Sequence, residues 1–357
     1  ILNLLTNYVL TKYLRNFFIV LISLELFFVG IDFLQNFKEV PPSANLQLLY
    51  ILYNAFFTLT LTLPLSLVFG WIITLILLVK NNELVAFLSV GVRPKSIYLP
   101  IVFVSFLLLS VLLALQATPL AYAYEQKNKI MDGEYFSSTK ADIFLKYNNY
   151  FIYFKRFFPL EKRAEDIHIF KIQDNDVVES IVASKANFYD NHWYVLDAKI
   201  TIKPSQIDWN TSKVIVKEEK SLETLEGFKP KILDNVYESK SNFSVIDAVY
   251  ALVLLKAQHI NTDTIRASLY YQVFVPFFIL PMLLIIFVST SINSRFFNIA
   301  KFSSLSVFCT LIFWGIFFML HKFAKGGVVI PEIALLVPLL LWFIIGYVAF
   351  KSRINLY

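Results

Sequence analysis

The chain has 357 residues, of which 57% are hydrophobic and only 16% charged, whereas ordinary soluble domains are about 45–50% apolar and about 25% charged. The apolar residues form long runs near both ends and leave a charged block between them, which excludes a simple soluble protein and indicates a membrane protein with a soluble insert. The net charge of +6 comes from basic residues beside the apolar runs, where they act as topology signals, so it does not indicate a nucleic-acid partner.

Six apolar segments are long enough to cross a bilayer, which takes about 20 residues. Three precede the charged block and three follow it, at residues 17–36, 47–79, 97–119, 268–290, 302–320 and 331–350. No small-x-small cleavage site follows the first segment, so we expect it to remain as a span. The second is too long for a perpendicular span, and Pro64 could kink it.

Lysines and arginines predict the orientation of these spans. One side of the membrane would hold nine of them: Lys12, Arg15, Lys80, Arg93, Lys95, Arg295, Lys301, Lys351 and Arg353. The other side would hold four: Lys38, Arg266, Lys322 and Lys325. Because the richer side is normally cytoplasmic, both termini are expected in the cytoplasm and the insert outside it.

The loop between the second and third spans predicts a short helix. One face of this helix would carry Leu84, Phe87, Leu88 and Gly91. Asn82 can cap the helix, the charge of Glu83 suits its first turn, and Pro94 follows its end. An apolar face in so short a loop must be buried, either against the chain's own bundle or in a partner's groove, and we favour the partner.

Two ionisable residues mark the first span. Glu25 lies near its middle, where such a group normally faces protein or a cavity. It is either hydrogen-bonded at a helix contact or involved in ligand passage. Lys38, at the outer end, is either an interfacial anchor or a contact for an anionic lipid headgroup.

The insert predicts β structure. Its expected strands are 150–154, 167–172, 182–188, 194–202 and 213–217, with turns near 174–176 and 190–191. Short strands at this spacing are typical of an antiparallel sandwich, a jelly roll or an open barrel. Residues 244–258 predict a partly amphipathic helix. The aromatic residues of the strands are either core or the lining of a groove for acyl chains. An open jelly roll would also leave an edge strand, at 150–154 or 213–217, to which a partner could add a strand.

The residues that usually carry catalysis form no motif in this chain. It contains no G-x-x-x-x-G-K-[ST] phosphate loop and no H-E-x-x-H metal motif. Its four histidines (His168, His192, His259 and His321) are scattered, and Cys309 is its only cysteine. We therefore expect no catalytic residue, no metal site and no cofactor in the chain itself.

In their order and spacing these features resemble the LptF/LptG (YjgP/YjgQ) permease family of the lipopolysaccharide exporter, over essentially the whole chain. The segments that carry the resemblance are Glu83-Leu84 with Gly91, Tyr98-Leu99-Pro100, Thr118-Pro119-Leu120-Ala121, Ala186-Asn187-Phe188-Tyr189 and Trp193-Tyr194-Val195-Leu196-Asp197, with Tyr270, Tyr271 and Pro276 matching more weakly. The Phe28–Phe37 stretch favours the LptG branch over the LptF branch.

The resemblance implies a polytopic α-helical protein of the bacterial inner membrane, with six spans in a 3+3 plan and an inserted periplasmic all-β, jellyroll-like domain. Residues 1–120 would hold spans one to three, residues 121–263 the insert, and residues 264–357 spans four to six. The chain would pair with a paralogous subunit as an LptF/LptG heterodimer. A dimeric LptB-like cytoplasmic ATPase would hold ATP and magnesium, and a single-span, LptC-like jellyroll protein would receive lipopolysaccharide.

The resemblance also implies two sets of site residues. A coupling helix at 82–93 would seat in the ATPase through Glu83, Leu84, Phe87, Leu88, Gly91 and Arg93. Lipid contacts are expected at Phe28, Asp32, Lys38, Phe151, Phe154 and Phe188. Two other functions stay open: a mechanotransmission-type permease that acts on periplasmic partners without moving lipid, and a membrane-anchored sensor, for which the cytoplasmic loops are short.

Overall fold

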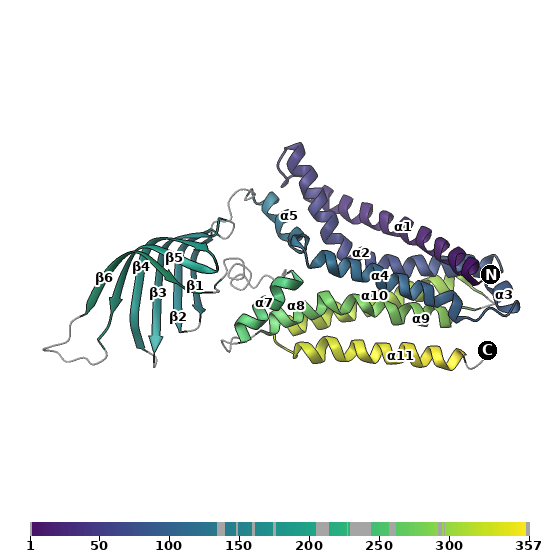
Figure 1. Ribbon diagram of the computed structural model, residues 1–357. Helices are drawn as coiled ribbons and strands as arrows, with labels where there is room; N and C mark the ends of the chain where they lie inside the picture. The colour runs from purple at the N-terminus through teal and green to yellow at the C-terminus, as the bar shows by residue number, and fades with distance from the viewer. Residues whose placement is uncertain are drawn as a thin grey trace. The chain divides into compact units, whose positions relative to one another are not determined.

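The computed structural model describes residues 2–133, 140–147, 149–158, 161–173, 176–204, 214–226, 228, 244–256, 262–291, 295 and 297–354. The chain divides into two compact units. The helical unit comprises residues 1–131, 242–249 and 262–357, and the β unit comprises residues 132–241 and 250–261 (Figure 1).

Helices make up most of the described part of the helical unit. They are α1 (Leu2–Gln35), α2 (Ala44–Lys80), α3 (Glu83–Ser89), α4 (Lys95–Gln116), α5 (Ala123–Met131), α8 (Asp263–Val273), α9 (Ile279–Ser289), α10 (Ile299–Lys325) and α11 (Val337–Ile354). Two 3-10 turns, η1 (Pro119–Tyr122) and η2 (Val275–Phe278), and one π-helical turn, η4 (Glu332–Leu336), lie between them. Helix α7 (Val245–Lys256) has residues in both units.

Five of the described helices are long and apolar enough to cross a membrane, and α8 with η2 and α9 forms a sixth candidate that is bent by 43°. Pro276 lies in η2 at the bend, where its missing N–H interrupts the helical ladder. Pro64, by contrast, lies inside the continuous helix α2. The predicted helical membrane region is therefore confirmed.

Helix α1 begins well before residue 17, where the first span was predicted to start. Val9, Tyr13 and Phe17 recur at helical spacing and are at most 1% exposed. At Gly70 of α2, an added Cβ would lie 2.8 Å from the Cα of Phe17, so glycine permits the close approach of the two helices. The charges of Lys12 and Arg15 interrupted the apolar run without ending the helix, because they lie outside its buried face.

Two buried tryptophans join α2 to α9 and α11 to η2, the turn that precedes α9. The indole N–H of Trp71 donates to the carbonyl of Leu283 at 3.2 Å, and that of Trp342 donates to the carbonyl of Phe278 at 3.1 Å. A buried indole needs such a partner, so each tryptophan adds direction to apolar packing. These contacts place α9 in the interior of the helical unit.

The described strands of the β unit form one antiparallel sheet in sequential order, and the sheet curves strongly (Figure 1). They are β1 (Lys140–Tyr147), β2 (Tyr150–Phe158), β3 (Arg163–Gln173), β4 (Asp176–Tyr189), β5 (His192–Ile202) and β6 (Ile215–Thr224). The predicted β insert is confirmed. Each described strand pairs with its neighbour in the chain, which is the order of a meander.

One face of the sheet forms the core of the β unit. Ile152 and Phe154 of β2 and Ile167 and Ile169 of β3 alternate along their strands and are at most 1% exposed. Trp193 of β5 lies in the same cluster at 1% exposure. Burial of each large side chain contributes about 1.5–3 kcal/mol, so this face supplies the main stabilisation of the sheet.

Candidate functional site

Helix α3 occupies the loop that the sequence singled out. The expected side-chain cap from Asn82 is wrong, because Asn82 has a left-handed backbone (φ 55°) and its side chain makes no capping hydrogen bond. Asparagine tolerates this conformation better than most residues. Gly91, after the helix, has φ +85°, so it supplies the left-handed turn that returns the chain toward α4.

Glu83 is bound within the chain. Both of its carboxylate oxygens accept hydrogen bonds from the ammonium of Lys12 on α1, at 2.6 and 2.7 Å, and Asn81 donates to one of them at 3.2 Å. Burial by itself would raise the pKa of Glu83, but the hydrogen bonds from Lys12 and Asn81 outweigh it and hold the pKa below its usual value. Glu83 therefore ties α3 to α1 as an ionised group.

The apolar face of α3 points toward the chain's own helices. Leu84 is 2% exposed and belongs to the core cluster, and Phe87 and Leu88 are half-buried against that cluster. The ring of Phe87 meets Tyr8 of α1 edge-on, with 6.4 Å between the ring centroids. The sequence left two sites of burial open, and this packing favours the bundle over a partner for the Leu84 side of the helix.

The opposite side of α3 is exposed. Ala86 and Ser89 are exposed in the helix, and Val90, immediately after it, is 82% exposed. Gly91 and Arg93 of the predicted coupling set are exposed as well. A partner that approaches α3 would therefore meet Ala86, Ser89 and Val90 before it met Phe87.

A largely buried ionic network joins α1, α2 and α5. The ammonium of Lys127 on α5 contacts both oxygens of Asp32 on α1, at 2.9 and 3.1 Å, and the side-chain oxygen of Asn54 on α2 at 3.4 Å. The Tyr50 hydroxyl donates to Asp32 at 2.6 Å. Lys127 is 5% exposed. Asp32, predicted as a lipid contact, is thus a partner of Lys127, which the sequence did not single out.

Loss of one member of this network should destabilise the helical unit. Lys127→Met would leave the Asp32 carboxylate without its cation. Because the Asp32 side chain is 27% exposed, the cost should be below the ~3–5 kcal/mol that breaking a fully buried pair from one side typically costs. We expect the melting temperature of the purified chain in lipid nanodiscs to fall markedly, and the double variant Lys127→Met/Asp32→Asn to recover part of the loss. Lys38→Met, at an exposed lysine, is the matched control. A fall no larger than that of the control would contradict a stabilising role for the network.

Glu25 is held between α1 and α2. The hydroxyl of Thr58 donates to its carboxylate at 2.7 Å, and Thr62 donates to the other carboxylate oxygen. Both threonines are more than 90% buried. Of the two interpretations that the sequence left open, the structure therefore favours a hydrogen-bonded helix contact.

The remaining predicted lipid contacts of α1 are accessible. Phe28 is 44% exposed on α1, and Lys38 is exposed just beyond its end. Phe28 lies in a surface stretch with Leu26 and Phe27, which are 71% and 57% exposed. This stretch can contact bilayer lipid or another protein without rearrangement of the helix.

The three predicted aromatic contacts of the insert do not share one surface. Phe154 is 1% exposed within the apolar core, and Phe188 packs edge-on against Trp193, with 5.6 Å between centroids. Phe151, one residue away from the core position of Ile152, stacks on Phe144 of β1 at 5.7 Å. Successive strand residues point to opposite faces, so Phe151 and Phe154 cannot line one groove.

The edges of the described sheet are β1 and β6. Residues 150–154, which the sequence offered as a possible edge, belong to β2 and pair on both sides, with β1 and β3. That expectation is wrong. Residue 213 lies outside the described residues, but Val214, Ile215 and Val216 are 59%, 53% and 51% exposed at the start of β6. An apolar stretch on an open strand edge is a template for strand addition.

An ion cluster that the sequence did not predict joins α8 to η4. Arg266 donates to Glu332 at 2.5 Å and to Asp263, and the Tyr270 hydroxyl donates to Glu332 at 3.1 Å. The only sequence signal for it was an arginine and a glutamate at the ends of two apolar segments. Among the described residues, no group of three His, Cys, Asp or Glu side chains is placed to hold a metal ion, and His259 lies outside them.

Comparison with known proteins identifies one family. A protein-family model described as lipopolysaccharide export system permease LptF/LptG matches residues 7–352. None of the curated proteins matches the chain. The single family model covers both branches, so the assignment to LptG stays a prediction.

Proposed function

The chain belongs to the LptF/LptG family of lipopolysaccharide export permeases, and from this premise we propose that it extracts lipopolysaccharide from the inner membrane within an ATP-driven exporter and passes it to a periplasmic β-jellyroll bridge. The observation that carries the proposal is the extent of the match, which spans both the helical unit and the β unit. A role that needs both units accounts for their presence in one chain. ATP and magnesium would be held by a separate dimeric ATPase.

The contacts of α3 support a route for mechanical coupling. Glu83 ties α3 to Lys12 of α1, and Leu84 anchors it in the helical core. A partner that moves the exposed surface of Ala86, Ser89 and Val90 would therefore displace α1 together with α3. Because α1 also presents Phe28 at its surface, this displacement would act on a wall that lipid can contact.

The apolar face of the β unit could form a path for lipid, but the path is closed in this structure. Its apolar face could carry acyl chains, since burial of one methylene is worth about 0.8 kcal/mol. In this structure the side chains of that face bury one another, as the exposure of Phe154 (1%) shows. Passage of lipid would thus require the packed side chains of this apolar face to move apart.

We also propose that both termini are cytoplasmic and the β unit periplasmic, on the Lys/Arg asymmetry of the span ends. In a Cys309→Ser background, cysteine introduced at the exposed Lys185 of β4 should react with a membrane-impermeant thiol reagent in spheroplasts. Cysteine at Ser352, near the C-terminus, should react only after the membrane is permeabilised. The reverse labelling pattern would overturn the orientation.

The experiment that tests the function is purification of the tagged chain from its native membrane under mild conditions, followed by mass spectrometry of proteins and lipids. We expect a paralogous permease, an ATPase, a jellyroll protein and lipopolysaccharide in one complex. Recovery of the ATPase without any lipopolysaccharide would favour a mechanotransmission permease. Recovery of neither would contradict the proposal.

A further inference from the structure

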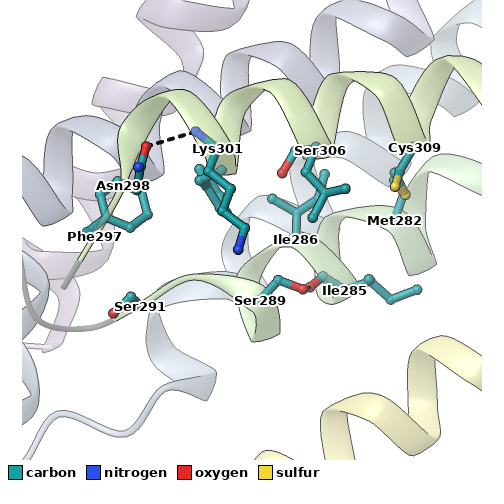
Figure 2. A pocket seen from close by; sticks show the side chains of 12 residues that line it. Met282, Ile285, Ile286, Ser289, Ser291, Phe297, Asn298, Lys301, Ser306 and Cys309 are labelled. Atoms are coloured by element: carbon teal, nitrogen blue, oxygen red, sulfur yellow. Dashed lines mark hydrogen bonds between the residues drawn. The ribbon is translucent and has the colours of Figure 1, made fainter.

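A pocket of about 250 Å³ lies between α9 and α10, where α9 ends and α10 begins (Figure 2). It is lined by Met282, Ile285, Ile286, Ser289, Ser291, Phe297, Asn298, Lys301, Phe302, Leu305, Ser306 and Cys309. One water molecule needs only about 10–15 Å³ of such space, so this volume admits a much larger group. The export mechanism proposed above does not use the pocket.

The rim of the pocket has the charge of an anion site. Lys301 projects from α10 across the pocket, toward the side on which Ser289 and Ser291 lie (Figure 2). None of the described residues that line the pocket is acidic, and no described residue forms an ion pair with Lys301. Asn298 caps α10 by accepting from the backbone N–H of Lys301 at 3.0 Å, and the first turn of α10 holds no acidic residue. The positive end of the helix dipole therefore adds to the charge of Lys301.

The hydroxyl of Ser306 is a second polar group at the pocket. Ser306 lines the pocket and is 7% exposed, and its side chain forms no hydrogen bond within the described part of the chain. Ser289 differs, because its hydroxyl donates to the carbonyl of Ile285 at 2.8 Å. The Ser306 hydroxyl has no hydrogen-bond partner among the described residues and borders the pocket, so it can bond an atom of a ligand there.

The deeper lining is apolar and suits hydrocarbon. Met282, Ile285 and Ile286 come from α9, and Leu305 and Cys309 come from α10. Leu305 is 56% exposed on a helix long and apolar enough to cross a membrane, so this side of the pocket can meet bilayer hydrocarbon. Polar rim and apolar interior together match a molecule with an anionic head and a hydrocarbon tail.

We propose that this pocket binds an anionic glycerophospholipid of the cytoplasmic leaflet, with its phosphate at Lys301 and Ser306 and the start of an acyl chain between α9 and α10. Lys301 belongs to the Lys/Arg-rich side of the spans, which places the site at the cytoplasmic leaflet. The assignment rests on the proposed orientation, and it is independent of the proposed export of lipopolysaccharide.

Cys309 provides a probe, because it is the only cysteine of the chain and lines the pocket. The full chain would be reconstituted in nanodiscs of phosphatidylcholine alone or with phosphatidylglycerol, and alkylation of Cys309 by a membrane-permeant maleimide would be timed. We expect phosphatidylglycerol to slow alkylation about tenfold, which corresponds to a contact worth about 1.4 kcal/mol. Lys301→Gln should remove most of this protection.

Two controls make the test decisive. Lys351→Gln, at an exposed lysine of the same Lys/Arg-rich side, should keep the protection, and unchanged melting temperatures would show that both variants are folded. Glycerol 3-phosphate added to phosphatidylcholine discs should not protect Cys309. The proposal is overturned if phosphatidylglycerol gives no protection, if protection survives Lys301→Gln, or if the soluble phosphate protects equally, which would indicate an anion site without a lipid. None of these outcomes bears on lipopolysaccharide export.

Discussion

Proline substitutions along β6 should weaken binding of the proposed periplasmic jellyroll partner in an alternating pattern, whereas alanine at the same positions should change binding little. The positions are Val216, Lys217, Glu218 and Glu219, which pair with Thr201, Ile200, Lys199 and Ala198 of β5. In an antiparallel ladder, alternate residues direct their N–H and C=O groups to the same neighbour. On an edge strand, every second residue therefore presents these groups outward, to a strand that a partner can add.

The two classes of position should behave differently. Proline at an outward position removes a donor to the partner, which costs about 0.5–1.5 kcal/mol for the bond and more through its fixed φ. Proline at an inward position removes a bond to β5 and should lower the melting temperature of the chain. Binding would be measured by pull-down of the partner with the full chain. Equal binding by all four proline variants, with the sheet intact, would show that β6 is not the joining edge and direct attention to β1.

Val90→Asp should abolish co-purification of the proposed ATPase partner while the chain remains folded in the membrane. Val90 is 82% exposed at the end of α3, so the substitution disturbs no internal packing. If Val90 is buried on docking, a charge there leaves an ion without a partner, and loss of such an interface anchor typically costs about 2 kcal/mol or more. The measurement is the amount of ATPase recovered with the tagged chain.

Val328→Asp is the matched control. Val328 is also an exposed valine (74%), but it lies beyond the C-terminal end of α10, away from α3. It should recover the ATPase in full. Phe87→Asp is expected to act differently from Val90→Asp. Phe87 packs on Tyr8, so its replacement by aspartate should destabilise the chain itself. Full ATPase recovery with Val90→Asp would contradict docking through the exposed side of α3.

The membrane region could be predicted from the sequence because apolar length and charge-free runs are direct requirements of a bilayer core. The helix in the 80–94 loop could be predicted as well, since Leu84, Phe87 and Leu88 keep helical spacing. Whether the chain's own helices or a partner protein bury that face could not be predicted. Periodicity identifies an apolar face but does not show what covers it. In this chain the cover includes Tyr8 of α1, which contacts Phe87 from far earlier in the sequence.

Contacts between residues far apart in the chain were what the sequence could not predict. Asp32 and Lys127 are 95 residues apart, and neither has a local signal for the other. The β segments were recognised by alternation, but alternation does not show which strand is at an edge, so residues 150–154 were open to assignment as an edge until pairing placed them inside the sheet. The same alternation, read strictly, separates Phe151 from Phe154 without a structure.

Photo-crosslinking at Phe28 tests the central claim of lipopolysaccharide transport most directly. Phe28 lies on the surface of α1, the helix that α3 would move, and it is 44% exposed. A photoreactive residue at this position, in the assembled exporter in native membranes, should capture lipopolysaccharide, and ATP turnover should reduce the captured amount as lipid moves on. Capture of phospholipid alone, unchanged by ATP, would contradict transport of lipopolysaccharide along this helix.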